Sequence, residues 1–174
     1  MTAENLFYFE LLAPITGIIA LVFAVYLALQ VNKYDIGPEK MRDIYMAIRE
    51  SSKAYLIQQY KTIGIVSAIL AVVLYVAFDL QGHNGTPLVS FSFLVGALFS
   101  LAAGYVGMDV ATRANARTAY AAQESLDVPL KIGYYGGLVM GLFNVGLSLL
   151  AVTGLYYLYG EVELIVGLGF GASL

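Results

Sequence analysis

Four long apolar stretches dominate the sequence, and short polar segments separate them. They cover about residues 11–31, 62–80, 89–110 and 133–159. Each is close to the roughly 20 apolar residues that a helix needs to cross about 30 Å of hydrocarbon. Backbone N–H and C=O groups find no water in lipid, so each stretch is expected to be helical. The pattern predicts an all-α, polytopic membrane bundle, with residues 1–174 forming a single membrane domain. The Gly-rich residues 167–171 predict the start of a fifth membrane helix.

A different pattern occupies residues 38–60, ahead of the second span. Pro38 and Glu39 are typical of a first helical turn, and apolar residues then recur at spacings of three and four. This stripe comprises Met41, Ile44, Tyr45, Ile48, Ser52, Tyr55 and Leu56. We expect an amphipathic cytoplasmic helix that runs into the second span. It would pack on the protein's own cytoplasmic face or lie in the headgroup layer, and docking of a partner is the alternative.

Basic residues occur only in two of the five segments that the spans delimit. The first group is Lys33, Lys40, Arg42, Arg49, Lys53 and Lys61, and the second is Arg113, Arg117 and Lys131. Because Lys and Arg are retained in the cytoplasm during insertion, both groups are placed inside and the N-terminus outside. The first span follows an acidic segment and has no cleavage site, so we expect it to be retained. The prediction is an integral protein of a prokaryotic plasma membrane.

Composition supports the membrane assignment and excludes several kinds of chemistry. Hydrophobic residues make up 60% of the chain, charged residues 12%, and the mean hydropathy is +0.78. The net charge of −3 is divided between the two membrane sides, so nothing indicates nucleic-acid binding. The absence of cysteine rules out disulfides, a thiolate nucleophile and Cys-ligated metals.

Rows of small residues spaced by four predict close helix packing. Gly96, Ser100 and Gly104 form one row on the third span, and Ala103, Gly107 and Ala111 form another. Gly133, Gly137 and Gly141 form a row on the fourth span, which we expect to face the third. The sequence Leu126-Asp127-Val128-Pro129 is expected to end the preceding helix. The second small-residue face of the third span still needs a partner, either further helices or a homo-oligomer.

Candidate functional residues are few, and none is an ionisable group at mid-depth of a span. Asp109 and Lys61 lie near span ends and are interpreted as interfacial anchors. Asn144 and Ser148 are the deepest polar pair, and an interhelical hydrogen bond explains them better than an ion ligand. Arg113 and Arg117 share one helical face and are interpreted as membrane-surface anchors.

The remaining motifs give no site either. His83 is the only histidine, and the acceptor pattern Asn84-Gly85-Thr86 lies too close to two spans to favour glycosylation. The Gly-rich residues 167–171 lack the strand and the Lys that a phosphate loop requires. The cytoplasmic carboxylates do not recur at a spacing that converges on a metal; they are Asp35, Glu39, Asp43, Glu50, Asp109, Glu124 and Asp127. We therefore predict no catalytic, cofactor-binding or metal-binding residue in this chain.

Three stretches of the sequence carry a family resemblance. They are MRDIYMAIRESSKAYLIQQYKT at residues 41–62, GALFSLAAGYVGMDVATRANARTAYAA at 96–122 and GGLVMGLFNVGLSLL at 136–150. The segments AGYVGM, TRANARTA and VMGL are the most specific parts. Together they resemble the amino-terminal quarter of the membrane-bound, ion-translocating pyrophosphatases. One departure is Ser51-Ser52, which stands where the family usually has Gly-Ala.

The resemblance implies more than the residues do. Members of the family that the chain resembles have an exterior N-terminus, about sixteen spans and a homodimeric assembly. They couple hydrolysis of magnesium pyrophosphate to the pumping of protons or sodium ions, and some depend on K⁺. The residues that resemble the family here correspond to outer-ring helices, and the Asp-rich catalytic motif of the fifth span would follow Leu174. We expect an inactive part of such a pump, and the alternative is a free-standing four-span structural or assembly protein.

Overall fold

The computed structural model describes residues 3–80 and 86–174, with side chains from residue 11 onward. Its elements are α1 (Ala3–Val31), α2 (Glu39–Leu74), the π-helical turn η1 (Tyr75–Asp79), α4 (Leu88–Ala121), α5 (Asp127–Tyr159) and α6 (Val162–Ala172). No strand occurs in the described part of the chain, and four of its helices are long and apolar enough to cross a membrane. These findings confirm the predicted all-α membrane bundle, and α6 is the predicted start of a fifth apolar helix.

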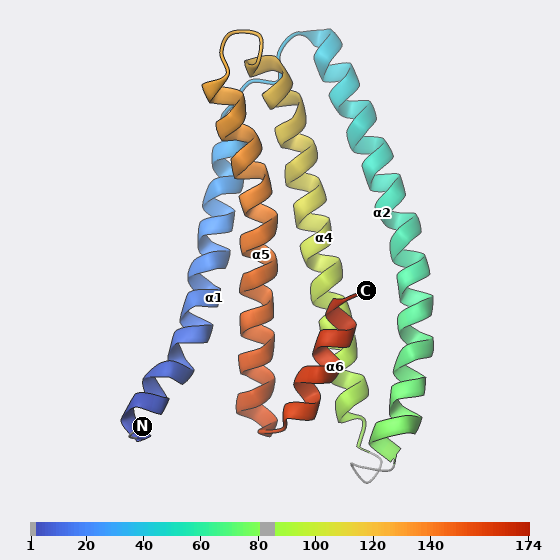
Figure 1. Ribbon diagram of the computed structural model, residues 1–174. Helices are drawn as coiled ribbons and strands as arrows, with labels where there is room; N and C mark the ends of the chain where they lie inside the picture. The colour runs from blue at the N-terminus through green and yellow to red at the C-terminus, as the bar shows by residue number, and fades with distance from the viewer. Residues whose placement is uncertain (1–2, 81–85) are drawn as a thin grey trace.

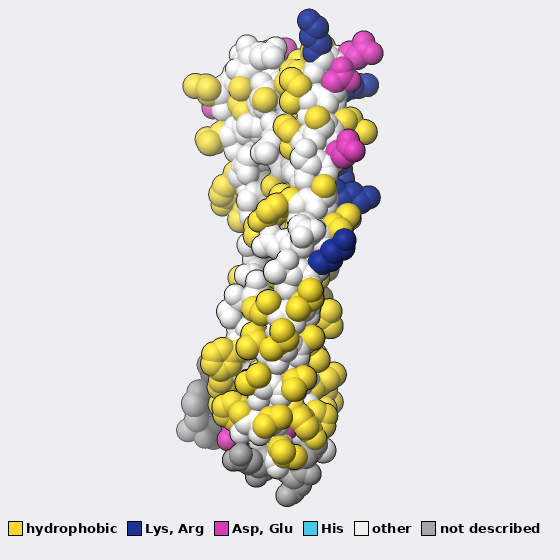
Figure 2. All heavy atoms as spheres, turned by 90° about the vertical axis from the view of Figure 1, so that its right-hand side faces the viewer, with side chains coloured by type: hydrophobic (Ala, Val, Ile, Leu, Met, Phe, Trp, Pro, Cys, Tyr) yellow, Lys and Arg dark blue, Asp and Glu magenta, His cyan; other side chains and the backbone are white. Residues whose placement is uncertain are grey.

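The long helices form an elongated bundle in which α4 is central (Figure 1). It packs against α5, α2 and α6, while α1 packs mainly against α5. The short helix α6 turns back beside α4 and ends near half the height of the bundle (Figure 1). Lys and Arg side chains gather in the upper half of the bundle, while the lower half is largely apolar (Figure 2). We refer to the end with the loops at 32–38 and 122–126 as the basic end.

The second helix is longer than a span requires. The residues expected to form the amphipathic helix and the second span form one continuous helical segment, Glu39–Asp79, which consists of α2 (36 residues) and η1. Its apolar stripe is only partly covered, since Tyr45 and Leu56 are half-buried while Ile44 and Tyr55 remain exposed. The Tyr60 hydroxyl donates a hydrogen bond of 2.5 Å to the carbonyl oxygen of Leu101 on α4. The amphipathic part therefore lies partly against the protein itself.

The connection between α4 and α5 differs from the prediction. The third-span helix ends at Ala121, and α5 already begins at Asp127, ahead of Pro129. Proline is tolerated in the first turn because its missing N–H would have no intrahelical partner there. Pro129 is thus part of the start of α5, and it does not mark the end of α4.

Two features shape the loop between α1 and α2. The backbone N–H groups of Gly37 and Ile36 donate hydrogen bonds to the Asp35 carboxylate and hold its pKa below the usual range. Gly37 has a φ of 95°, a left-handed conformation that favours glycine, and the Tyr120 ring of α4 lies directly over it. A side chain at position 37 would meet that ring, so the loop is fixed against α4.

The glycine row of the fourth span packs differently from our expectation. A Cβ atom added at Gly133, Gly137 or Gly141 would have no atom within 4 Å, so this row makes no close contact with α4. The neighbouring Gly136 faces α4 instead, where an added Cβ would lie 3.0 Å from that of Ala114. Each residue advances a helix by about 100°, so a shift of one position turns the row away from the interface. The expectation for this row was therefore wrong.

Each small-residue row of α4 packs against another helix over part of its length. Gly107 receives the Met140 side chain of α5, and the carbonyl oxygen of Leu168 on α6 lies directly over Gly96. On α6, Gly171 lies in the same way beneath the carbonyl oxygen of Phe93. The two backbones of α4 and α6 therefore approach as closely as glycine permits. Ser100 and Gly104, further along the first row, lie beyond the end of α6 and border open grooves.

An acidic side chain closes the opposite end of the α2–α4 pair. Asp79, in η1, is fully buried and accepts hydrogen bonds from the backbone N–H groups of Val89 (2.8 Å) and Ser90 (3.0 Å). It also accepts one from the Ser90 hydroxyl at 2.5 Å. The first N–H groups of a helix lack intrahelical partners, so Asp79 acts as a cap supplied by the preceding helix. His83 and Asn84-Gly85 lie outside the described residues.

Candidate functional site

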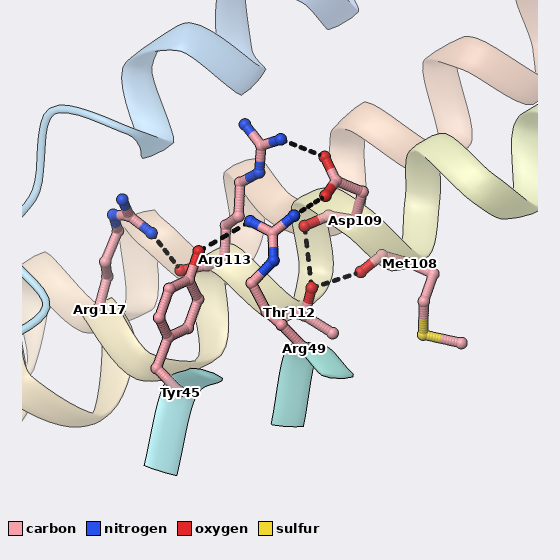
Figure 3. A network of polar contacts seen from close by, with 7 residues as sticks. All are labelled: Tyr45, Arg49, Met108, Asp109, Thr112, Arg113 and Arg117. Atoms are coloured by element: carbon pink, nitrogen blue, oxygen red, sulfur yellow. Dashed lines mark hydrogen bonds and ion pairs between the residues drawn. The ribbon is translucent and has the colours of Figure 1, made fainter. Parts of the chain in front are cut away.

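A cluster of polar side chains lies between α2 and α4 near the basic end (Figure 3). Its centre is Asp109, whose two carboxylate oxygens accept separate guanidinium groups. Arg49 of α2 reaches one oxygen at 2.5 Å, and Arg113 of α4 reaches the other at 2.5 Å. Arg113 is one turn beyond Asp109 on the same helix, whereas Arg49 comes from a helix 60 residues earlier. The carboxylate therefore joins two helices.

Neighbouring groups hold this arrangement in place. The second terminal nitrogen of Arg49 donates to the Tyr45 hydroxyl at 2.9 Å, and the Arg49 guanidinium lies 5.7 Å from the Tyr45 ring centre. The Thr112 hydroxyl donates back to the carbonyl oxygens of Met108 and Asp109, as is common for Thr inside a helix. The Nε of Arg113 is buried and has no partner among the described residues. Both terminal nitrogens of Arg49 thus donate hydrogen bonds within the chain, one to Tyr45 and one to Asp109.

The strength of the cluster is limited by its exposure. The side chains of Arg49, Asp109 and Arg113 retain 34%, 21% and 32% of their accessible surface. Exposed ion pairs contribute about 0–1 kcal/mol each, and partial burial with charge-assisted geometry raises that to roughly 1–2 kcal/mol. The cluster is thus a moderate link between α2 and α4. Our interpretation of Asp109 as an interfacial anchor named neither of its two partners.

Arg117 forms a second link at the basic end. Its Nε donates to the carbonyl oxygen of Tyr34 at 2.9 Å, and a terminal nitrogen donates to the carbonyl oxygen of Arg113 at 2.8 Å. The residue is 8% exposed. Our expectation of a membrane-surface role was wrong for Arg117, because its guanidinium fastens the loop after α1 to α4. Arg113 shares its helical face but binds Asp109.

The cluster has little capacity for catalysis. Each oxygen of Asp109 already binds a guanidinium group, and these two positive charges would repel a divalent cation from this carboxylate. Within residues 3–80 and 86–174, no three His, Cys, Asp or Glu side chains converge as a metal site would require. The described residues therefore offer no site that fits magnesium, and the prediction that the chain holds no site residue stays a prediction.

Asn144 and Ser148 do not form the expected hydrogen bond within the chain. Both are exposed, and neither has a hydrogen-bond partner among the described residues. Asn144 borders a groove of about 450 Å³. The other residues that border it come from α4, α5 and the end of α6, and all but Met140 are small. They are Ser100, Ala103, Gly104, Gly137, Met140, Gly141 and Ala172. The deepest polar side chain of α5 thus faces an open, small-residue surface.

Sequence comparison assigns the chain to a known family. Residues 18–174 match the sequence profile of the family described as inorganic H+ pyrophosphatase. The chain belongs to this family. Among the similar proteins is the "K(+)-insensitive pyrophosphate-energized proton pump" of Methanosarcina mazei, 45% identical over 93% of this chain. The proton pump of the same name from Pyrobaculum aerophilum is 41% identical over 98% of the chain.

Other members of the inorganic H+ pyrophosphatase family have a different ion in their names. A protein of Clostridium tetani named "Putative K(+)-stimulated pyrophosphate-energized sodium pump" is 37% identical over 95% of the chain. The match covers 23%, 24% and 24% of these three relatives, so the chain spans about a quarter of their length. The predicted resemblance to an amino-terminal quarter of the family is therefore confirmed.

Two parts of the structure were not anticipated from the sequence. The link between Arg49 and Asp109 joins residues 60 positions apart, and no local pattern pairs them. A weak signal exists in Tyr45 and Arg49, which are four residues apart and share a helix face. The cap formed by Asp79 has a clearer signal, because an acidic residue ends one apolar stretch about ten residues before the next helix begins.

Proposed function

We propose that this chain is the outer-ring, amino-terminal part of a pyrophosphate-driven proton or sodium pump and is inactive alone. The observation that carries the proposal is the family match, which extends to residue 174 yet covers about a quarter of each relative. Pyrophosphate hydrolysis needs divalent cations, carboxylates that hold them and a positioned water. The described carboxylates provide no such arrangement. Magnesium and any required K⁺ would bind to the rest of the pump.

The open surface of the bundle supports a role as a scaffold for further helices. The Gly96 end of one α4 row is covered by α6, while Ser100 and Gly104 of the same row border grooves that α6 leaves open. Leu174 borders one of these grooves together with residues of α2, α4 and α5. Asn144, whose amide has no partner among the described residues, borders one groove beside these small residues. Small residues next to a polar side chain are typical of helix interfaces in membranes. The occupants would be the remaining helices of the pump, and a second copy of the chain is the other outcome.

The orientation follows from the charge distribution. The basic end of the bundle would lie in the cytoplasm and the N-terminus outside, in a plasma membrane. Single cysteines at Lys53 and Thr86 can test this, because the chain has no cysteine of its own. A membrane-impermeant maleimide should label the two positions from opposite sides of sealed vesicles. Labelling of both from one side would contradict the orientation.

The proposed function is tested by measuring phosphate release from magnesium pyrophosphate. The purified chain should show no turnover above a blank, because its described residues offer no group of carboxylates that could hold a metal. Co-expression with a polypeptide that carries the remaining three quarters of a relative should restore turnover and ion uptake into vesicles. Turnover by the chain alone would overturn the proposal. Failure to associate with that polypeptide, with a stable four-helix fold retained, would favour the free-standing structural protein.

A further inference from the structure

The short helix α6 has the direction of a membrane span but only half of its length. Its 11 residues rise about 16 Å, roughly half of the 30 Å that a span must cover. It ends near half the height of the four helices that are long enough to cross a membrane (Figure 1). A helix end at that height has no water for its last carbonyl groups, and further helical turns are their simplest partners.

The backbone at the end of α6 keeps the helical direction. Helix α5 ends at Gly160, whose φ of 68° is left-handed and turns the chain out of the helix. Ser173, which follows α6, has a φ of −83° and a ψ of −5°, both in the right-handed region. A continuation of α6 therefore needs no change of backbone conformation at this residue.

The end of α6 points at a surface where two grooves meet. One groove, of about 380 Å³, lies between α2 and α4 and is bordered by Leu174. The other, of about 450 Å³, lies between α4 and α5 and is bordered by Ala172. Ser100, Gly104 and Met140 border both grooves. The grooves are therefore the two flanks of one surface, and α6 reaches its edge.

This surface continues the contact that α6 already makes with α4. An added Cβ at Gly96 would lie 2.9 Å from the backbone nitrogen of Ala172, and Ser100 and Gly104 follow Gly96 at intervals of four on the same helix face. The two helices run in the same direction (Figure 1), so four residues along α4 correspond to about four along α6. Ser100 would thus face the second residue after Leu174, and Gly104 the sixth.

The residues of the surface define the kind of helix that fits it. Among the described residues that border the two grooves, none has a charged side chain. Ser100, Gly104, Gly137 and Gly141 are small, so larger apolar side chains of an incoming helix can fill the space beside them. The Asn144 amide has no hydrogen-bond partner among the described residues, and burying it unpaired would be costly. The helix that fits is apolar and has one hydrogen-bonding group near Asn144.

We propose that a helical continuation of α6 occupies this surface, lying over Ser100 and Gly104 with its flanks in the two grooves. The proposal rests on the proposed function, because the residues that continue α6 would belong to the rest of the pump. It also gives a role to Gly137 and Gly141 of α5, which make no close contact within the chain. A second copy of the chain and a separate helix are the other occupants that the test distinguishes.

The test extends the chain beyond Leu174 by about 12 residues taken from the corresponding position of the Methanosarcina mazei relative, which gives α6 the length of a full span. A cysteine at the second added residue is paired with Ser100→Cys, in a chain that has no cysteine of its own. This pair should form a disulfide within one chain. Leu98→Cys is the control, because Leu98 is exposed on α4 and borders neither groove, and its pair should not cross-link above background.

Two leucine variants test whether the groove itself is occupied. Gly141→Leu and Gly133→Leu both place a side chain where nothing lies within 4 Å, but only Gly141 borders the groove. Gly141→Leu should lower the yield of the Ser100 cross-link by about fivefold, as overpacking of an occupied site does, and Gly133→Leu should leave it unchanged. Both variants of the unextended chain should unfold at the same temperature as the parent.

Three results would overturn the proposal: cross-links between two chains, equal yields for Ser100→Cys and Leu98→Cys, or equal effects of Gly141→Leu and Gly133→Leu. None of these measurements requires pyrophosphate hydrolysis. An intact cross-link without restored turnover would contradict the proposed function alone. Restored turnover without the cross-link would contradict this inference alone.

Discussion

The crossing of α4 and α6 should tolerate almost no added volume at Gly171. A Cβ atom there would overlap the carbonyl oxygen of Phe93 and lie 2.8 Å from the backbone nitrogen of Ala97. Both obstacles are backbone atoms of α4, which cannot rotate away as a side chain would. Gly171→Ala must therefore move one helix, by about 1 Å or more, to restore ordinary van der Waals contact.

Gly169 provides the matched control, because it lies on the same helix and an added Cβ would have nothing within 4 Å. Gly169→Ala should be neutral or stabilising, since Ala is favoured over Gly in a helix by about 0.8–1 kcal/mol. Gly171→Ala gains the same propensity, but overpacking typically costs about 1–3 kcal/mol, so we expect net destabilisation of about 0–2 kcal/mol. The difference between the two variants, about 1–3 kcal/mol, isolates the cost of the contact.

The assay is disulfide cross-linking of a cysteine pair at Ala97 and Ala172, combined with thermal unfolding in detergent. Because the chain contains no cysteine, the pair would be the only one present. Cross-linking should fall and unfolding should occur at a lower temperature in Gly171→Ala. Gly169→Ala should cross-link like the parent and unfold at the same or a higher temperature. Equal behaviour of the two variants would refute the close approach of the α4 and α6 backbones.

Three further predictions concern other contacts of α4. Gly136→Leu should reduce cross-linking between α4 and α5, whereas Gly137→Leu, which points into open space, should leave it unchanged; the reverse result would restore the row expected from the sequence. Asp109→Asn should weaken the α2–α4 link by roughly 1–2 kcal/mol and increase protease cleavage of the basic end of α2, with Glu50→Gln as an unaffected control. Asp79→Ala should cost about 1–3 kcal/mol of unfolding free energy and speed hydrogen exchange at the first turn of α4, and unchanged exchange there would contradict the cap.

Hydropathy alone was sufficient to predict which residues form helices, but not which face of each helix contacts its neighbour. The lipid leaves no other option for the backbone, so each long apolar stretch became a helix. The rotation of a helix depends on small differences in packing, and Gly136 and Gly137 are equally suited to close approach by composition. Only the complementary surface of α4 selects Gly136. The row at 133, 137 and 141 was for this reason assigned a close contact that Gly136 makes instead.

The polar cluster shows a second limit of sequence reasoning. Charge patterning placed Asp109, Arg113 and Arg117 near one membrane boundary, which agrees with their position at the basic end. Their partners could not be inferred, since Arg49 and Tyr34 are brought to α4 only by the packing of α2 and α1. Long polar side chains reach several neighbours, and the choice among them is made by tertiary structure.

The cap at Asp79 has a consequence for the order in which the chain assembles. Its partners on α4 follow it by only 10 and 11 residues, so the contact can close once the next helix starts to form. A charged aspartate is costly in a membrane until it is paired, and this pairing needs no later part of the polypeptide. The second and third spans can therefore enter the bilayer as a preassembled hairpin. The surfaces left open on α4 and α5 would then be the last to be filled during biogenesis.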